Sequence, residues 1–239
     1  MNEHIWEILT DAFPKLLGYG VRVTIPLMLL SFALALVISI LVALVQYANI
    51  KGLRLICRFY IWVVRGTPLL VQLYLIFYGL PKMGIVLDAF PCAVMVMGLN
   101  EAAYMAETVR GALESVSKGQ VEAGRCIGLN YLQIMRHIVL PQAFRVAFPA
   151  LSNSMISMTK ETSLAATITV MEMFRQAQVI NGRVYQPLAL YTLVALIYLA
   201  FCTILTAGQH WGEKKLGSYG QTSRPESLFS RLFGRRKAV

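Results

Sequence analysis

Charged side chains inside long apolar stretches are the first candidates for chemistry in this sequence. Lys160 and Glu161 interrupt the stretch 146–171, and Glu101 interrupts the stretch 89–106. A charge at the centre of a bilayer costs roughly 2.5–3.5 kcal/mol on insertion scales, so charged residues there are functional candidates. A lysine beside a glutamate offers one partner for each charged group of a zwitterion.

Other polar residues extend this candidate lining of a path. The whole set is Asn153, Ser157, Lys160, Glu161, Thr162 and Ser163, together with Glu101 and Tyr104. At a rise of 1.5 Å per residue, Lys160 lies about 22 Å along a helix from Arg145, in the outer half of a hydrocarbon core about 30 Å thick. Neighbouring helical residues point about 100° apart, so both members of the pair reach one groove only if the helix breaks there. A helix end at the exterior surface is the alternative explanation.

Five apolar stretches could span a membrane, which takes about 20 mostly apolar residues each. They are 23–45, 59–81 (interrupted by Arg65 and Pro68), 89–106, 146–171 and 184–212. The chain is 57% hydrophobic and 14% charged, whereas soluble domains carry about 25% charged residues. We therefore expect an all-α integral membrane protein with about five transmembrane helices. Its parts are an exterior segment 1–22, a transmembrane domain 23–212 and a basic tail 213–239, which we expect to be disordered.

The distribution of lysine and arginine predicts the orientation. Sixteen of the 22 lie in alternate connections that include 110–145 and the tail, and six lie in the others. Cytoplasmic loops carry the excess of basic residues, so the N-terminus is expected outside and the C-terminus inside a bacterial cytoplasmic membrane.

Several other functions are disfavoured by the sequence. The net charge of +10 comes from basic residues at the ends of apolar stretches, without the aromatic-interleaved basic run typical of nucleic-acid binding. The four cysteines lie far apart, which predicts neither a metal site nor a disulfide framework. No lysine precedes Ser or Thr, so the chain has no phosphate-binding loop for ATP, and it contains no H-E-x-x-H or G-x-S-x-G motif.

Two further charged positions have plainer interpretations. Arg65 lies near the cytoplasmic end of its stretch, where its long stem can place the guanidinium at the interface and anchor the helix. Glu107 and Arg110 are three residues apart, so a local ion pair is expected.

The connection 110–145 predicts two short amphipathic helices. Ser117 and Gln120 fit a capping box that opens the first helix, and Gly128 can end it. Asn130 with Gln133 can open the second, and Pro141 is expected to close it.

This connection resembles the EAA loop of ABC importer permeases. That pattern reads E-A-A, three residues, Gly, nine residues, Ile, one residue, Leu-Pro. The sequence keeps every spacing with Glu122-Ala123-Gly124, Gly128 and Ile138-Val139-Leu140-Pro141, and departs only by Gly124 in place of the second alanine. Five further segments are similar to the polar amino-acid branch of that superfamily: Arg65-Gly66-Thr67-Pro68-Leu69, Ala103-Tyr104 with Ala106-Glu107, Arg110-Gly111, Gly119-Gln120 and Lys160-Glu161-Thr162-Ser163-Leu164. The resemblance covers about residues 15–210.

The resemblance implies a permease subunit that is not itself an enzyme. The loop would be a coupling helix seated in a groove of a separate ATPase, with contacts from Glu122, Ala123, Gly124, Gly128, Leu140 and Pro141. Small residues at 123, 124 and 128 would let two backbones approach closely, although a helix packed only on its own subunit is the alternative. ATP and Mg would be bound by the partner, and this chain would hold no cofactor.

The implied mechanism is alternating access for polar amino acids. The implied partners are two copies of the ATPase, a second identical or homologous permease, a periplasmic or surface substrate-binding protein and the lipid bilayer. A secondary transporter or channel is the first rival, disfavoured because no internal repeat is visible. An intramembrane enzyme is the second.

Overall fold

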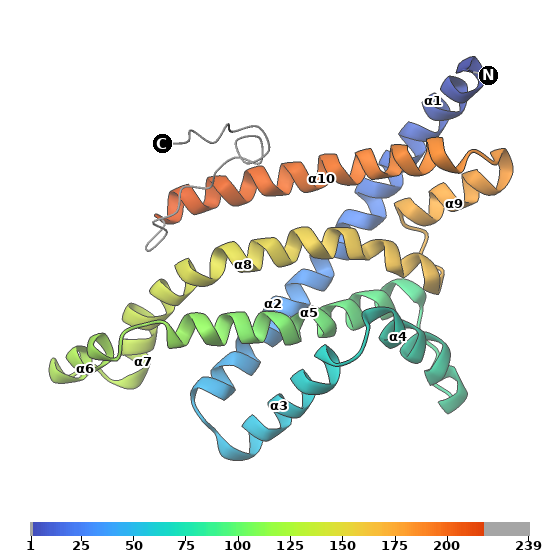
Figure 1. The fold of residues 1–239 in the computed structure, drawn as a ribbon. Helices are drawn as coiled ribbons and strands as arrows, with labels where there is room; N and C mark the ends of the chain where they lie inside the picture. Colours follow the sequence, from blue (N-terminus) through green and yellow to red (C-terminus); the bar gives the residue numbers. More distant parts are fainter. Residues whose placement is uncertain (1, 218–239) are drawn as a thin grey trace, which may run out of the picture.

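The computed structural model describes residues 2–217, and every regular element in this part of the chain is helical (Figure 1). The α-helices are α1 Asn2–Tyr19, α2 Ile25–Tyr47, α3 Lys51–Arg65, α4 Leu69–Tyr74, α5 Ala89–Glu114, α6 Lys118–Cys126, α7 Tyr131–Ile134, α8 Leu140–Glu161, α9 Met173–Val184 and α10 Pro187–Leu216. Three π-helical turns, η1 Gly20–Thr24, η2 Leu75–Gly79 and η4 Met135–Val139, and two 3-10 turns, η3 Leu80–Met83 and η5 Thr162–Ile168, join or extend them. The predicted all-α class is confirmed. The predicted tail begins within α10, and the rest of it lies outside the described residues.

The N-terminal helix is longer than the sequence analysis predicted. Segment 5–47 is one apolar helical segment of 43 residues, in which the π turn η1 joins α1 to α2. The segment before residue 23 is helical because it has its own packing face: Ala12 and Leu16 are buried beside Ala177 of α9 and Leu190 of α10. Asp11 and Lys15 pair on the exposed side of α1, with 2.6 Å between Oδ2 and Nζ.

Close packing of α2 on α5 forms the centre of the bundle. The buried face of α2 carries a small residue at every fourth position, at Ser31, Ala35, Ser39 and Ala43. Small residues at this spacing let two helices approach closely in a membrane, where hydrophobicity alone does not hold helices together. Gly98 of α5 lies against Leu34 of α2, so that a Cβ at position 98 would come within 2.8 Å of the Leu34 Cδ2.

The second predicted span is sharply bent. The segments 51–65 and 69–83 meet at 103°, with Pro68 extended at the bend. A proline ring disfavours helical backbone at the residue that precedes it, which accounts for the break at this position. The Gln72 side-chain amide holds the bend by donating to the carbonyls of Val64 and Thr67, at 2.9 and 3.1 Å. Its oxygen accepts from the Asn100 amide at 3.0 Å and so ties the bend to α5.

Pro141 does not close a helix, contrary to the prediction. Helical structure continues from Tyr131 through η4 and α8 to Glu161. A proline removes one backbone donor from a helix and its ring crowds the preceding turn. The π turn directly before Pro141, in which the Leu140 amide donates to the Met135 carbonyl, widens the helix where the proline would otherwise break it.

The fourth predicted span differs most from its prediction. Its α-helix ends at Glu161, and the chain continues as the 3-10 turn η5. Three segments (5–47, 89–114 and 187–216) are long and apolar enough to cross a membrane, and the bent pair can be a fourth. Since α8 carries Arg145, Lys160 and Glu161, composition alone does not identify it as a span, yet it packs between α5 and α10 in the same bundle (Figure 1).

A buried carboxylate joins three elements that are far apart in the sequence. Glu172 has no exposed surface and caps α9 by accepting from the Arg175 amide at 2.7 Å. It also accepts from the hydroxyls of Thr24 and Tyr198, at 3.3 and 3.0 Å. Burial raises the pKa of the Glu172 carboxyl, and the hydrogen bonds oppose that change. The site fixes η1, α9 and α10 to one another.

Substitution of Gly98 tests the α2–α5 contact. Gly98→Ala is expected to destabilise the protein by about 1–3 kcal/mol, because the new methyl meets the Leu34 Cβ as well as the movable end of that side chain. Gly111→Ala is the matched control on the same helix, where a Cβ meets nothing within 4 Å and should stabilise by about 0.5–1 kcal/mol. Thermal unfolding in detergent measures both, and equal stability of the two variants would contradict close packing at Gly98.

Candidate functional site

A polar groove of about 490 Å³ lies between the start of α4, the middle of α5 and the second half of α8. The residues that line it are Thr67, Pro68, Leu69, Asn100, Glu101, Tyr104, Ala150, Asn153, Ser154, Ser157 and Glu161. Two carboxylates, two side-chain amides and several hydroxyls thus face one space, an arrangement suited to a small polar molecule with a cationic group.

The groove contains five of the eight predicted path residues: Glu101, Tyr104, Asn153, Ser157 and Glu161. On α8, residues 153, 157 and 161 are spaced four apart and therefore share one helix face. Glu101 is 8% exposed, whereas Tyr104 is 41% exposed. The Arg65 Cζ lies over the Tyr104 ring, 5.2 Å from its centroid. The Arg65 guanidinium therefore packs on the aromatic side of the groove, a contact that the sequence did not predict.

Lys160 lies on another side of α8 from Glu161. It lines a separate pocket of about 600 Å³ with Ser163 and the α10 residues Tyr198 and Cys202. Thr162 is fully buried and donates to the Thr159 carbonyl at 2.7 Å. Because α8 ends only after Glu161, Lys160 and Glu161 still point about 100° apart around the helix. The two side chains therefore do not share one groove.

Sequence reasoning missed Thr67, Asn100 and Ser154 as groove residues. Signals for two of them existed: Asn100 precedes Glu101, and Thr67 belongs to the segment Arg65-Gly66-Thr67-Pro68-Leu69. Pro68 indicates a break, but the angle of the bend that brings Thr67 beside Asn100 and Ser154 depends on how α4 packs on α5. Among residues 2–217 no group of three His, Cys, Asp or Glu side chains could hold a metal ion.

The second candidate region is the helix pair α6–α7, which projects from one end of the bundle (Figure 1). Gly128 ends α6 with a φ of 82°, as the sequence predicts. The Asn130–Gln133 capping box forms, with both hydrogen bonds at 2.9 Å. The predicted Ser117 box does not form, because the Ser117 side chain makes no capping hydrogen bond.

The glycines of this pair act in different ways. A Cβ on Gly124 would lie 3.0 Å from the Ile138 Cδ1 and 3.2 Å from the Ile134 Cγ1, so this glycine lets α6 seat closely on the next helix. A Cβ on Gly128 would meet nothing within 4 Å. Within this chain, Gly124 is therefore required for close packing, whereas Gly128 is required for its left-handed backbone.

The exposed side of α6–α7 combines charge with apolar surface. Glu122 and Ala123 are exposed, and Ile127, Tyr131 and Leu132 present large apolar side chains to the outside. Leu140, the first residue of α8 directly after η4, is half-exposed. An exposed patch of this kind is typical of a protein-binding surface.

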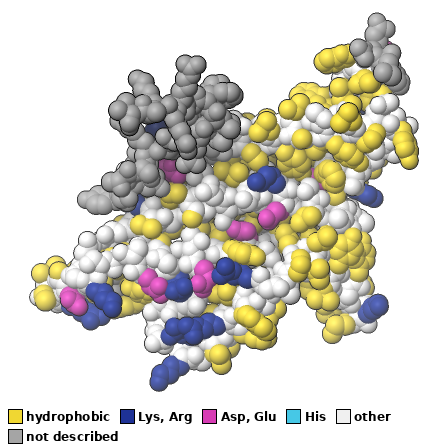
Figure 2. All heavy atoms as spheres, viewed as in Figure 1, with side chains coloured by type: hydrophobic (Ala, Val, Ile, Leu, Met, Phe, Trp, Pro, Cys, Tyr) yellow, Lys and Arg dark blue, Asp and Glu magenta, His cyan; other side chains and the backbone are white. Residues whose placement is uncertain are grey.

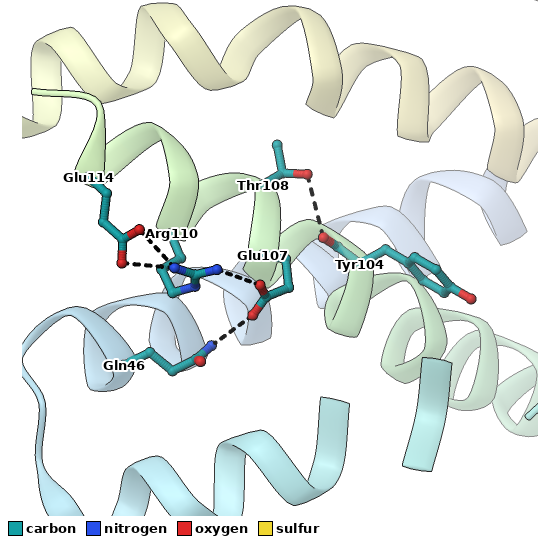
Figure 3. Close-up of polar contacts among 6 residues, drawn as sticks. All are labelled: Gln46, Tyr104, Glu107, Thr108, Arg110 and Glu114. Carbon is teal, nitrogen blue, oxygen red and sulfur yellow. Dashed lines mark hydrogen bonds and ion pairs between the residues drawn. The ribbon is translucent and has the colours of Figure 1, made fainter. Parts of the chain in front are cut away.

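A charged cluster lies directly before this helix pair (Figure 3). Arg110 bridges Glu107 and Glu114 on α5, with nitrogen–oxygen distances of 2.6 and 2.8 Å, which confirms the predicted Glu107–Arg110 pair. The Gln46 amide at the end of α2 reaches Glu107 at 3.5 Å. The cluster therefore joins the ends of α2 and α5 at the base of α6.

Together, the apolar helical bundle, the polar groove within it and the projecting helix pair define a membrane transport subunit. The comparisons identify its family. Residues 35–218 match the family described as binding-protein-dependent transport system inner membrane component, and the chain belongs to this family. It is an ABC importer permease of the amino-acid branch and an inner membrane protein.

Several named relatives match nearly the whole chain. The L-cystine transport system permease protein TcyB of Bacillus subtilis is 42% identical over 90% of this chain and 92% of its own length. The octopine transport system permease protein OccM of Rhizobium radiobacter is 40% identical over 80% of this chain and 81% of its own. The arginine transport system permease protein ArtQ of Bacillus subtilis is 34% identical over 83% and 91%.

Solved structures agree with the fold. A chain of an amino acid ABC transporter crystallised with histidines superposes with a TM-score of 0.80 at 32% identity, over 86% of this chain and 96% of that one. An inward-facing MetNI methionine ABC transporter chain gives a TM-score of 0.71 at 19% identity, over 84% and 96%, and supports the fold alone.

Proposed function

We propose that this chain translocates polar amino acids by alternating access, coupled to ATP hydrolysis by a separate subunit. The observation that carries the proposal is the polar groove with Glu101 and Glu161 inside a bundle of apolar helices. Relatives named for cystine, octopine and arginine transport support a substrate that bears both a carboxylate and an amino group.

Coupling is assigned to the α6–α7 pair. Its exposed residues Glu122, Ala123 and Ile127 form the surface for the ATPase, which binds ATP and Mg. Helical structure runs unbroken from Tyr131 to Glu161, so a movement of α7 is transmitted along α8 to the groove. A rigid element shared by two sites is a physical means of coupling them.

Two substitutions in the helix pair test this coupling. Glu122→Lys reverses a charge that becomes partly desolvated on docking, and Gly128→Leu forces a branched residue into a left-handed backbone. We expect each variant to insert normally while ATPase affinity falls at least about tenfold and substrate-stimulated hydrolysis is lost. Co-purification and hydrolysis in reconstituted membranes are the measurements.

Conservative variants at the same positions are the controls. Glu122→Asp keeps the charge, and Gly128→Asn keeps a residue that tolerates a positive φ, so both should retain assembly. Unchanged assembly and hydrolysis in Glu122→Lys and Gly128→Leu would contradict the docking role.

The substrate path is assigned to the groove, with Glu161 as the member of the predicted pair that faces it. Glu161 shares the groove with Asn153, Ser157 and Glu101, so a substrate ammonium group there meets carboxylates and amide oxygens. Lys160 faces the α10 pocket, outside the groove, and is given no contact with the substrate.

Replacement of the pair separates the two roles. Glu161→Gln is expected to lower transport per molecule at least about tenfold, because a charge-assisted hydrogen bond to the substrate is lost. ATPase docking should persist, since α6–α7 lies at the other end of the helix. Lys160→Met, the adjacent control, is expected to change protein abundance more than transport per molecule. Uptake normalised to membrane protein distinguishes these results, and wild-type turnover in Glu161→Gln would reject the path role.

We further propose that the N-terminus is outside and the C-terminus inside, as the basic residues suggest. A second identical or homologous permease would complete the path, and a periplasmic or surface binding protein would deliver the substrate. The orientation places α6–α7 on the cytoplasmic side, where the ATPase is.

Cysteine labelling tests the orientation. In a variant without the four native cysteines, Val86→Cys should react with an impermeant maleimide in intact cells, because Val86 is 80% exposed in the connection before α5. Ser218→Cys, two residues beyond the last residue of α10, should react only after the membrane is opened. Labelling of Ser218→Cys in intact cells would reverse the assignment.

A further inference from the structure

The surface of α3 combines a row of arginines with an exposed apolar face, and the proposed transport cycle uses neither Arg54, Arg58 nor the apolar side chains. One stripe carries Arg54, Arg58 and Arg65, at helical spacings that place all three on one face. The adjoining face carries Leu55, Ile56, Phe59 and Trp62, each between 62% and 72% exposed. Figure 2 shows Lys and Arg side chains gathered over α3, beside the acidic side chains at the end of α5.

The arginine stripe opens into a pocket of about 300 Å³. Its polar lining is Gln46, Arg54, Arg58, Arg65, Glu107, Arg110 and Glu114, and Ile61 and Trp62 close it on the α3 side. Four arginines thus face two glutamates. Both glutamates are already engaged by Arg110 in the cluster of Figure 3, which leaves the α3 arginines in excess.

Two of those arginines have unused donors. The Arg54 Nε is buried and has no hydrogen-bond partner, although the same guanidinium donates to the Asn49 side-chain oxygen. Within residues 2–217, Arg58 has neither an ion pair nor a hydrogen bond, although it lines the pocket. A buried donor without a partner is unfavourable, so an acceptor is expected at this place.

We propose that the pocket between α3 and α5 binds the phosphate group of an anionic phospholipid, with Arg54 and Arg58 as the phosphate ligands. Arginine's planar fork suits two phosphate oxygens, and basic pockets between helices at a membrane interface are recognised lipid headgroup sites. One acyl chain lies on Phe59 and Trp62, whose rings pack at 6.0 Å between centroids and continue the stripe along α3. Aromatic residues are typical of the headgroup level of a bilayer.

The continuous apolar face favours a lipid over a free anion. A free phosphate would use the arginines and leave the exposed Leu55, Phe59 and Trp62 without a partner. A phospholipid satisfies both surfaces. Because the same pocket contains Glu107 and Gln46, a bound lipid also stabilises the joint between α2 and α5 at the base of α6.

Lipid titration of the full-length protein tests the proposal. The protein, purified with its ATPase partner in mild detergent, is titrated with phosphatidylglycerol or with phosphatidylcholine of the same acyl chains, and bound lipids are counted by native mass spectrometry. Wild type is expected to hold phosphatidylglycerol preferentially. Arg54→Gln with Arg58→Gln should weaken that binding roughly 25-fold, because each arginine near a phosphate contributes about fivefold. Binding of phosphatidylcholine should be unaffected.

Two matched variants make the result specific. Arg22→Gln with Arg183→Gln removes the same charge from exposed positions on η1 and α9 and should keep wild-type binding. Arg54→Lys with Arg58→Lys keeps the charge without the fork and should lie between the two. The basic residues beyond α10 are the same in all variants. Any lipid that they bind therefore contributes equally to each measurement and does not affect the differences between variants.

Three results would overturn the proposal. One is equal phosphatidylglycerol binding in the Arg54→Gln and Arg58→Gln protein at unchanged thermal stability. Another is inorganic phosphate that binds the pocket as tightly as the lipid, which would make it a free-anion site. The third is efficient cross-linking of Trp62→Cys between two permease copies, which would assign the apolar face to a subunit interface.

Discussion

The close contact between α2 and α5 is the constraint on which the rest of the bundle depends. In lipid, apolar side chains gain little by leaving a neighbouring hydrocarbon, so helix association relies on van der Waals packing between closely spaced backbones. The small residues of α2 and Gly98 of α5 permit that spacing. The bend at Pro68 is tied to α5 through Gln72 and Asn100, and α8 packs on the other side of α5. The groove therefore forms around α5.

The polar groups of this protein gather where helices bend or end. Thr67 follows the end of α3, Glu161 ends α8, and Glu172 begins α9. Backbone groups near helix ends lack intrahelical partners and need polar surroundings. These positions therefore hold both a buried carboxylate with hydrogen-bond partners, as at Glu172, and a polar lining of the groove, as at Glu161.

Irregular helix geometry lets long elements act as single units. The π turn η1 keeps α1 continuous with α2, and the π turn η4 keeps α7 continuous with α8. In the second case the π turn also accommodates Pro141. Helical structure is therefore unbroken from α7 to the groove, which makes the two regions parts of one rigid element. The cluster of Gln46, Glu107 and Arg110 fixes the base of that pair to α2 and α5 (Figure 3).

Local chemistry is what the sequence by itself determined. The apolar stretches, the left-handed turn at Gly128, the Asn130–Gln133 capping box and the Glu107–Arg110 pair each depend on residues within a few positions of one another, so the sequence was sufficient to predict them. Packing decided the rest. The sequence could not show that Glu161 faces the groove while Lys160 faces α10, because that depends on the rotation of α8 between its neighbours. Nor could it show that a π turn carries the helix through Pro141, or that Thr24 and Tyr198 meet at Glu172, since contacts across 148 and 26 residues form only when the helices pack.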